Sequence, residues 1–79
     1  MEKSEIIELV KRRLRALDLK GITISVVEQG VRNDENWWYV PVHAEREPKK
    51  AHEYYEVLTE VEDDLKSKEK LDVLLVPSA

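Results

Sequence analysis

Residues 36–43 read NWWYVPVH and contain both tryptophans and one of the three tyrosines of this 79-residue chain. In a β-strand, successive side chains point to opposite faces. An extended backbone therefore places Trp38 with the valines on one face, and Trp37, Tyr39 and His43 on the other. A chain of this length builds a single small core. One of the two sets is thus expected to stay near the surface, where a partner can contact it.

The composition indicates one small folded domain that covers residues 1–79. Hydrophobic residues make up 42% of the chain and charged residues 38%, which is typical of a folded, soluble and highly charged domain. Two glycines and three prolines favour short connections over long loops. A core of this size predicts a free energy of unfolding on the order of a few kcal/mol, unless a second subunit adds buried area.

Several classes of protein are disfavoured by composition. The chain has no cysteine, which excludes disulfides, thiolate metal sites and thiol chemistry and is compatible with a cytoplasmic location. No apolar run approaches the length of a membrane span, and the first residues lack the apolar core of a signal peptide. The net charge of −4 argues against a broad nonspecific grip on nucleic acid or anionic lipid, although it allows a local basic patch.

Two segments show the periodicity of amphipathic helices. Ser4 is the expected N-cap of the first helix, and Gly21 is expected to end it. Its apolar residues recur at spacings of three and four: Ile6, Ile7, Val10, Leu14 and Leu17. Pro48 suits the first position of the second helix. The apolar stripe of that helix consists of Ala51, Tyr54, Leu58, Val61 and Leu65.

Three segments are predicted to be strands. Residues 22–27 alternate and are rich in β-branched side chains, and a turn over residues 33–36 connects them to the aromatic strand as a β-hairpin. Residues 71–76 form the last strand, which Pro77 ends. The expected order of elements is α-β-β-α-β.

This order predicts an α+β fold, a two-layer α/β sandwich whose three-stranded mixed sheet carries both helices on one face. Pro41 cannot donate to a ladder, so the aromatic strand is expected at an edge of the sheet. The strand over residues 22–27 would then be central, and the last strand would lie on its far side.

The alternation of side chains divides the sheet into a covered and an open face. The inward set is expected to be Ile22, Ile24, Val26, Trp38, Val40, Val42 and Ala44. The open face is expected to hold Val27, Trp37, Tyr39, Leu74 and Val76. Three interpretations of this face remain: aromatic rings covered by lysine and arginine stems, a homodimer or hetero-partner interface, or a platform that stacks bases or sugars.

Charged residues form three groups. The second helix carries an acidic stripe made of Glu53, Glu56, Glu60, Asp63 and Asp64. The first helix carries a basic run made of Lys11, Arg12, Arg13 and Arg15. The two groups are either solvated surface that attracts across neighbouring helices or docking surfaces for partners. Near the start of the second helix, a candidate anion site consists of Arg46, Lys49, Lys50 and His43, unless Glu45 and Glu47 neutralise it.

Catalysis is the least favoured class. His52 and Glu56 are spaced i and i+4 and could share a metal ion, but the spacing indicates no third ligand. Ser25 on a strand could lie across from His43, yet no third residue completes a triad. We therefore expect no catalytic residues, no metal site and no cofactor.

The predicted order of elements is similar to that of K-homology-like nucleic-acid-binding domains. Those domains hold a nucleic-acid backbone with a GXXG loop between two helices. Gly21 and Gly30 are the only glycines here and stand apart, so no residue is carried over from that family.

The leading hypothesis is a small, non-catalytic protein-interaction module that self-associates, or docks on another protein, through the open face. The alternative is a nucleic-acid or phosphate-ligand binding domain. In that case Arg46, Lys49 and Lys50 would contact phosphates, and Trp37 or Tyr39 would stack on bases.

Overall fold

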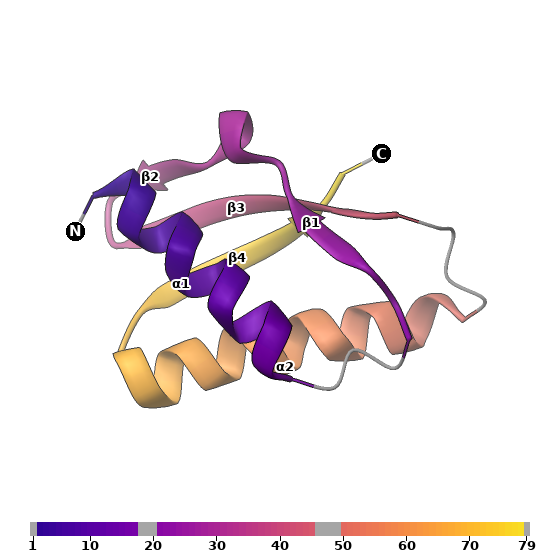
Figure 1. The fold of residues 1–79 in the computed structure, drawn as a ribbon. Coiled ribbons are helices and arrows are strands. Elements are labelled where there is room, and N and C mark those ends of the chain that lie inside the picture. The colour runs from indigo at the N-terminus through magenta and orange to yellow at the C-terminus, as the bar shows by residue number, and fades with distance from the viewer. Residues whose placement is uncertain (1, 18–20, 46–49, 79) are drawn as a thin grey trace.

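The computed structural model describes residues 2–17, 21–45 and 50–78 (Figure 1). The elements in chain order are α1 (Lys3–Ala16), β1 (Ile24–Val26), the short 3₁₀ helix η1 (Glu28–Gly30), β2 (Arg32–Asp34), β3 (Trp37–Ala44), α2 (Ala51–Glu69) and β4 (Asp72–Pro77). The α+β class predicted from the sequence is confirmed. The described sheet has four strands rather than the three expected, because η1 divides the first predicted strand region from a further short strand, β2.

The aromatic strand β3 is the central strand of the sheet. β1 and β2 both pair with it in antiparallel fashion, β1 along residues 42–44 and β2 along residues 37–39. β4 pairs with β3 in parallel along residues 37–42, on the other side. The prediction of an edge position for the aromatic strand, with β1 in the centre, is therefore wrong.

A bulge explains how a central strand tolerates Pro41. The N–H of Val27 donates to the carbonyl oxygen of Pro41 at 2.9 Å, and the carbonyl oxygen of Val27 accepts from the N–H of Gly30 at 3.1 Å. The N–H that proline lacks is therefore not needed at this point, because η1 supplies a replacement donor to Val27. Proline inside a sheet is confined to edges or bulges, and the bulge is used here.

Gly30 permits this close approach of η1 to β3. A Cβ atom added to Gly30 would lie 2.7 Å from Cγ of Pro41, which is closer than real side chains approach. The absence of a side chain at Gly30 therefore lets η1 pack directly against the proline ring.

The hairpin between β2 and β3 closes with a tight turn within the predicted turn region, but its first strand is β2 rather than residues 22–27, and Asn33 and Asp34 belong to β2. Asp34 is in register with Trp37, which leaves Glu35 and Asn36 as the two turn residues. Glu35 has a left-handed φ of 56°. The side-chain amide of Asn33 donates to the carbonyl oxygen of Trp37 at 3.2 Å and further ties the two strands together.

Alternate residues of the strands join both helices in one hydrophobic core. The buried strand and loop residues are Ile24, Val31, Val40, Val42, Val73 and Leu75. The buried helix residues are Ile6, Ile7, Val10, Leu14, Tyr54, Val57, Leu58, Val61 and Leu65. Ile22, Val26, Trp38 and Ala44 pack against this cluster and are partly buried, so the inward set expected for the sheet is confirmed.

The helix boundaries differ from the predictions in detail. α1 begins at Lys3, and its N-cap is Glu2 rather than Ser4, because the Glu5 carboxylate accepts from the N–H of Glu2 at 3.2 Å. Its last helical residue is Ala16. Gly21 has the positive φ of 78° expected of a glycine in a turn, whereas residues 18–20 between them lie outside the described residues.

The buried face of the second helix differs from the predicted apolar stripe at its start and in its middle. α2 begins at Ala51, which is exposed, and the expected first-turn residue Pro48 lies outside the described residues. Val57 is fully buried although the predicted stripe omitted it. At the other end, Lys70 adopts a left-handed φ of 55° and caps the helix.

The opposite charges of the two helices meet at one arginine. The guanidinium group of Arg13 lies 3.1 Å from Asp64 and 3.0 Å from Glu69; the side chains of Arg13 and Asp64 are largely shielded from solvent, whereas Glu69 is exposed. Lys68 contacts Asp64 as well, at 3.2 Å. The predicted attraction between the basic run and the acidic stripe therefore holds for Arg13 and Asp64. Among the described residues, neither α1 nor α2 is long and apolar enough to cross a membrane.

Candidate interaction face

The strand register places the predicted open-face residues in rows across the sheet. Tyr39 is in register with Arg32 on one side and Leu74 on the other. The next row places Pro41 beside Val76, and Val27 is hydrogen-bonded to the proline from the opposite side. Because residues in register share a face of the sheet, these side chains form one continuous surface around Tyr39. We call this surface the aromatic face.

The aromatic face exposes three large hydrophobic side chains. Trp37 is 48% exposed, Leu74 38% and Val76 37%, and all three are large hydrophobic side chains. Tyr39 and Val27 are half-buried. The alternate residues of β4, Val73 and Leu75, are buried in the core. β4 is therefore apolar toward both sides, although the described residues bury only one of them.

Charged side chains border the aromatic face along β2. The guanidinium carbon of Arg32 lies 5.0 Å from the centroid of the Tyr39 ring, within the range of a cation–π contact. Asp34 is in register with Trp37 and is exposed. An arginine and an aspartate two residues apart on one strand thus give this border both signs of charge. Sequence reasoning missed Arg32, because its neighbour across the strand could not be known without the register.

The outer edge of β4 is covered by a carboxylate from α2. Glu62 accepts a hydrogen bond from the N–H of Leu75 at 2.7 Å. Burial raises the pKa of Glu62, the hydrogen bond from Leu75 lowers it, and the neighbouring charge of Asp63 raises it again, with a net upward shift. An edge strand with its backbone donor occupied is less available for pairing with another chain.

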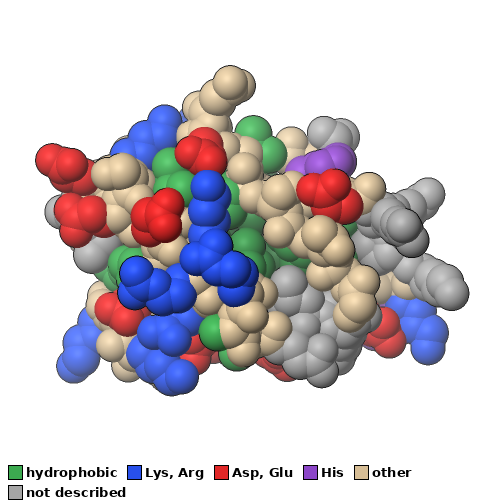
Figure 2. All heavy atoms as spheres, viewed as in Figure 1, with side chains coloured by type: hydrophobic (Ala, Val, Ile, Leu, Met, Phe, Trp, Pro, Cys, Tyr) green, Lys and Arg blue, Asp and Glu red, His purple; other side chains and the backbone are tan. Residues whose placement is uncertain are grey.

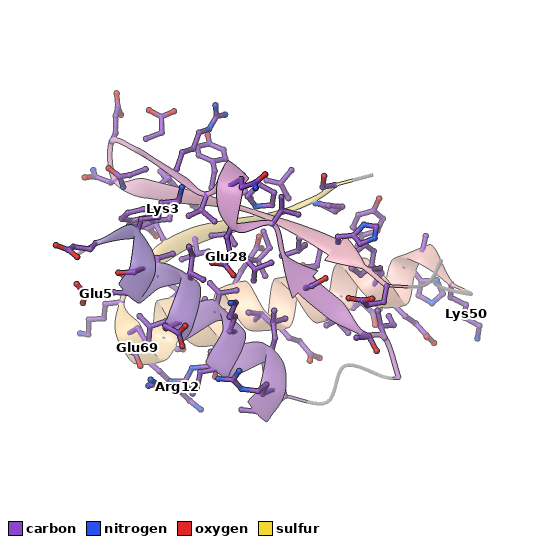
Figure 3. The ribbon with its side chains drawn as sticks, turned by 45° about the horizontal axis from the view of Figure 1, so that its top comes forward. Lys3, Glu5, Arg12, Glu28, Lys50 and Glu69 are labelled. Carbon is purple, nitrogen blue, oxygen red and sulfur yellow. The ribbon has the colours of Figure 1, made fainter. Side chains whose placement is uncertain are left out.

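The predicted anion site is described only in part. Arg46 and Lys49 lie outside the described residues. Lys50 is the exposed N-cap of α2, at the far end of that helix from Glu69 (Figure 3). His43 is exposed on β3, and its Nδ1 lies 3.5 Å from the carbonyl oxygen of Ser78. Nothing in the described part of the chain brings the His43 ring and the Lys50 side chain together, so this site stays a prediction.

Ser25 and His43 do lie across from one another, as the sequence suggested. They are in register between β1 and β3. The hydroxyl of Ser25, however, donates to the backbone carbonyl of His43 at 3.4 Å and to the Glu45 carboxylate at 3.1 Å, rather than to the imidazole ring. The Ser25 hydroxyl is thus directed to the Glu45 carboxylate and a backbone carbonyl, and the structure does not pair it with the His43 ring.

The exposed side of α2 holds the other candidate residues. His52, Glu56 and Glu60 border a shallow hollow together with Tyr55 and Thr59. Tyr55 is 56% exposed. The described residues contain no group of three or more histidine or acidic side chains placed to hold a metal ion.

The chain matches no protein-family model, none of the curated proteins and no solved structure. An interpretation of the aromatic face therefore depends on its own geometry and chemistry.

Proposed function

We propose that the protein is a small, non-catalytic interaction module that self-associates through the aromatic face, with both helices packed against the opposite face of the sheet. The observation that carries this proposal is the apolar set on β3 and β4. Trp37, Leu74 and Val76 together expose large hydrophobic side chains on neighbouring strands. Contiguous apolar surface of this kind marks interaction sites, and tryptophan and tyrosine are enriched among residues that dominate binding energy.

The border charges support a second copy of the chain as the occupant. Two copies related by a two-fold axis present the same surface to each other, so each charge must meet its complement in the same patch. Arg32 and Asp34 supply both signs on the same strand and the same face. A two-fold partner can therefore place its Asp34 opposite Arg32 without leaving either charge unpaired.

The dimensions of the face indicate a weak dimer. β3 has eight residues, and a rise of about 3.3 Å per residue makes the face about 26 Å long. Strands spaced about 4.8 Å apart make it about 14 Å wide. This footprint is smaller than the roughly 800 Å² per partner of a standard interface. We therefore expect a dissociation constant in the micromolar range or weaker, and the association must be measured up to high protein concentration.

Replacement of Trp37 by alanine tests this proposal. About half of a side chain that buries up to roughly 250 Å² is exposed, which leaves about 120 Å² for the partner to cover. At about 25 cal/mol per Å², this burial contributes about 3 kcal/mol for each copy. Sedimentation equilibrium should show dimerisation weakened by about a hundredfold or more, while circular dichroism shows an unchanged fold.

Tyr55→Ala is the matched control, because Tyr55 is an equally exposed aromatic residue on α2 rather than on the sheet. It should leave association unchanged. Three results would contradict the proposal: a wild-type chain that stays monomeric at millimolar concentration, equal effects of the two variants, or unfolding of Trp37→Ala. In the last case Trp37 contributes chiefly to the core.

The nucleic-acid alternative makes a different prediction for the same samples. A binder of phosphates should retain single-stranded oligonucleotides at low salt and release them steeply as the salt concentration rises. We favour self-association because the open face of the described residues exposes Trp37, Leu74 and Val76 and carries one arginine.

A further inference from the structure

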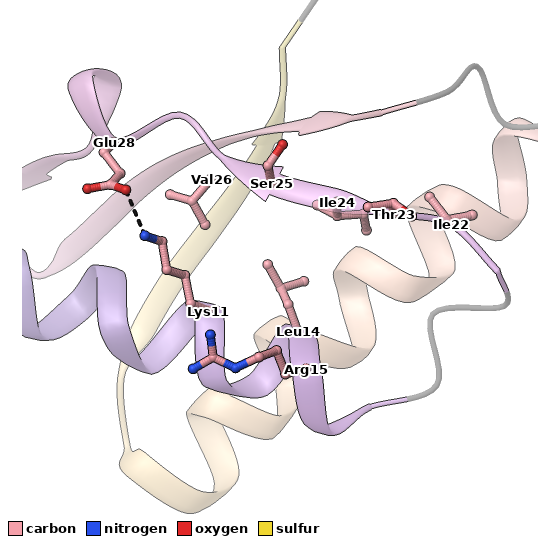
Figure 4. Close-up of a pocket in the computed structure, with 9 residues that line it drawn as sticks. All are labelled: Lys11, Leu14, Arg15, Ile22, Thr23, Ile24, Ser25, Val26 and Glu28. Carbon is pink, nitrogen blue, oxygen red and sulfur yellow. Dashed lines mark hydrogen bonds and ion pairs between the residues drawn. The ribbon is translucent and has the colours of Figure 1, made fainter.

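A second surface, separate from the aromatic face, lies between α1 and the edge of the sheet (Figure 4). It is a groove of about 570 Å³ between β1 and the last turns of α1. Its apolar lining consists of Leu14, Ile22, Ile24 and Val26. Its polar lining consists of Lys11, Arg15, Thr23, Ser25 and Glu28.

One wall of the groove is an unpaired strand edge. The hydrogen bonds from Val27 to Pro41 and from Glu45 to Thr23 show that the odd-numbered residues of this segment direct their backbone groups toward β3. In an antiparallel ladder, the alternate residues direct theirs the opposite way. The N–H and C=O groups of Ile24 and Val26 therefore face outward, and among the described strands β1 pairs only with β3. An edge of this kind is a template for one more strand.

The β1 and β4 edges of the sheet differ in what occupies their outward backbone groups. On β4, the Glu62 carboxylate occupies the outward N–H of Leu75 at 2.7 Å. On β1, the described residues place no side chain on the outward groups of Ile24 and Val26, and an apolar groove runs beside them. Among the described residues, the β1 edge thus combines unpaired outward backbone groups with an adjacent apolar groove, and it is open to strand addition.

The charged side chains beside the groove indicate which kind of peptide would bind there as an added strand. Lys11 and Arg15 of α1 line it, and Glu28 pairs with Lys11 at 2.7 Å. This leaves Arg15 as an exposed cation without an ion pair among the described residues. Lys and Arg side chains gather in the middle of this side of the molecule, over the position of α1, with hydrophobic atoms showing beside them (Figure 2). Such a border attracts carboxylates.

The same charge disfavours a second copy of this chain in the groove. Two copies joined by antiparallel pairing of their β1 edges would bring their α1 helices together. Each groove is lined by Lys11 and Arg15, so like charges would lie on both sides of the junction. Like charges in an interface disfavour the pairing.

We propose that the β1 edge binds an extended acidic peptide segment of another protein as an added strand. The backbone of the peptide hydrogen-bonds with Ile24 and Val26. Its apolar side chains contact Leu14 in the groove, and its carboxylates contact Arg15. This is strand addition, in which main-chain hydrogen bonds supply affinity and side-chain pockets supply specificity.

The test uses a short acetylated peptide of alternating glutamate and valine, with nuclear magnetic resonance of the ¹⁵N-labelled full chain as the readout. Binding should shift the amide signals of Ile24 and Val26 and the methyl signals of Leu14. A peptide with lysine in place of glutamate should bind at least about tenfold more weakly, because it repels the border charges. A glutamate peptide with alternate backbone amides N-methylated should lose binding, because it cannot donate to the edge.

Arg15→Glu should weaken binding of the glutamate peptide about five- to tenfold, as expected for reversal of one exposed charge contact. Arg12→Glu is the matched control. It makes the same change of charge on the same helix, but Arg12 lies outside the groove lining, on the side of α1 away from Glu28 (Figure 3). Both residues are exposed, so neither variant should unfold the chain.

Four results would overturn the proposal: no shifts at high peptide concentration, equal binding of the lysine peptide, equal effects of Arg12→Glu and Arg15→Glu, or shifts centred on Trp37 and Leu74. Self-association that is lost in Val26→Pro but kept in Trp37→Ala would also overturn it, because a second copy would then occupy the edge. Failure of the aromatic face to associate would leave these results unaffected, since the two surfaces use different residues.

Discussion

Replacement of Gly30 by alanine tests the bulge that allows a proline in the central strand. The added Cβ atom would lie 2.7 Å from Cγ of Pro41, whereas carbon atoms pack best at about 3.5–4.0 Å. Forcing the two apart by nearly 1 Å is an overpacking error of the kind that destabilises by about 1–3 kcal/mol. Alanine also stiffens the unfolded chain, which offsets about 0.4–1 kcal/mol. We expect Gly30→Ala to lower the free energy of unfolding by about 1–2 kcal/mol.

The assay is urea unfolding followed by tryptophan fluorescence, carried out as a double-mutant cycle with Pro41→Ala. In that background the nearest remaining atom of residue 41 is its Cβ, 3.6 Å from the added methyl, which is an ordinary contact. In the Pro41→Ala background, Gly30→Ala should therefore lower the free energy of unfolding by less than about 0.5 kcal/mol. The coupling free energy between residues 30 and 41 should then be about 1 kcal/mol or more.

Gly21→Ala provides the comparison for loss of a glycine without a close contact. Gly21 has a φ of 78° and no atom within 4 Å of an added Cβ. The loss of stability in Gly21→Ala should come from backbone strain, and it should be the same in the wild-type and Pro41→Ala backgrounds. Equal costs of Gly30→Ala in the two backgrounds would refute the steric explanation of the bulge, and so would a stabilising effect of Gly30→Ala in the wild-type chain.

Two further predictions concern the end of α2 and the edge of β4. Lys70→Gly should raise the free energy of unfolding by about 0.5–1 kcal/mol, since Lys70 has a left-handed φ of 55° that glycine adopts without strain; a lower urea midpoint would contradict this. Burial raises the pKa of Glu62, so the folded chain holds this proton more tightly than the unfolded chain does. The contribution of Glu62 to stability therefore falls as the pH rises from its unfolded pKa through its folded pKa. Glu62→Gln keeps an acceptor for the N–H of Leu75, so the variant should be as stable as the wild type or up to about 0.5 kcal/mol more stable at neutral pH. Its free energy of unfolding should also depend less on pH in the acidic range. A variant that is less stable than the wild type at neutral pH would show that the charged hydrogen bond outweighs the cost of desolvation.

The sequence predicted those elements whose periodicity is strong. The three- and four-residue spacing of Ile6, Val10 and Leu14 located α1, and Tyr54, Leu58 and Val61 located α2, because one face of each helix must be apolar to be buried. The two-residue alternation of β3 identified Val40 and Val42 as core residues. Helix ends were less well predicted, since Glu2 rather than Ser4 is the N-cap of α1.

The order of the strands was mispredicted from a single residue. Pro41 suggested an edge strand, because proline cannot donate to a ladder. The missing donor concerns only one position, however, and a bulge at that position satisfies the same constraint. Whether Val27 and Gly30 form such a bulge depends on the packing of η1 over the proline ring, which no local pattern of the sequence reports.

By itself, the sequence determined which side chains of each helix and strand are apolar, and hence which face of each element is buried. It also predicted that Trp37, Leu74 and Val76 lie on the open face of the sheet, and all three side chains are exposed. Only the tertiary structure decided that β3 and β4 lie side by side, that Arg32 lies over Tyr39, and that Glu62 occupies the outward N–H of Leu75 on β4. The reason is physical: burial within one element follows from its own periodicity, whereas the neighbours of a strand depend on contacts between segments that are distant in the chain.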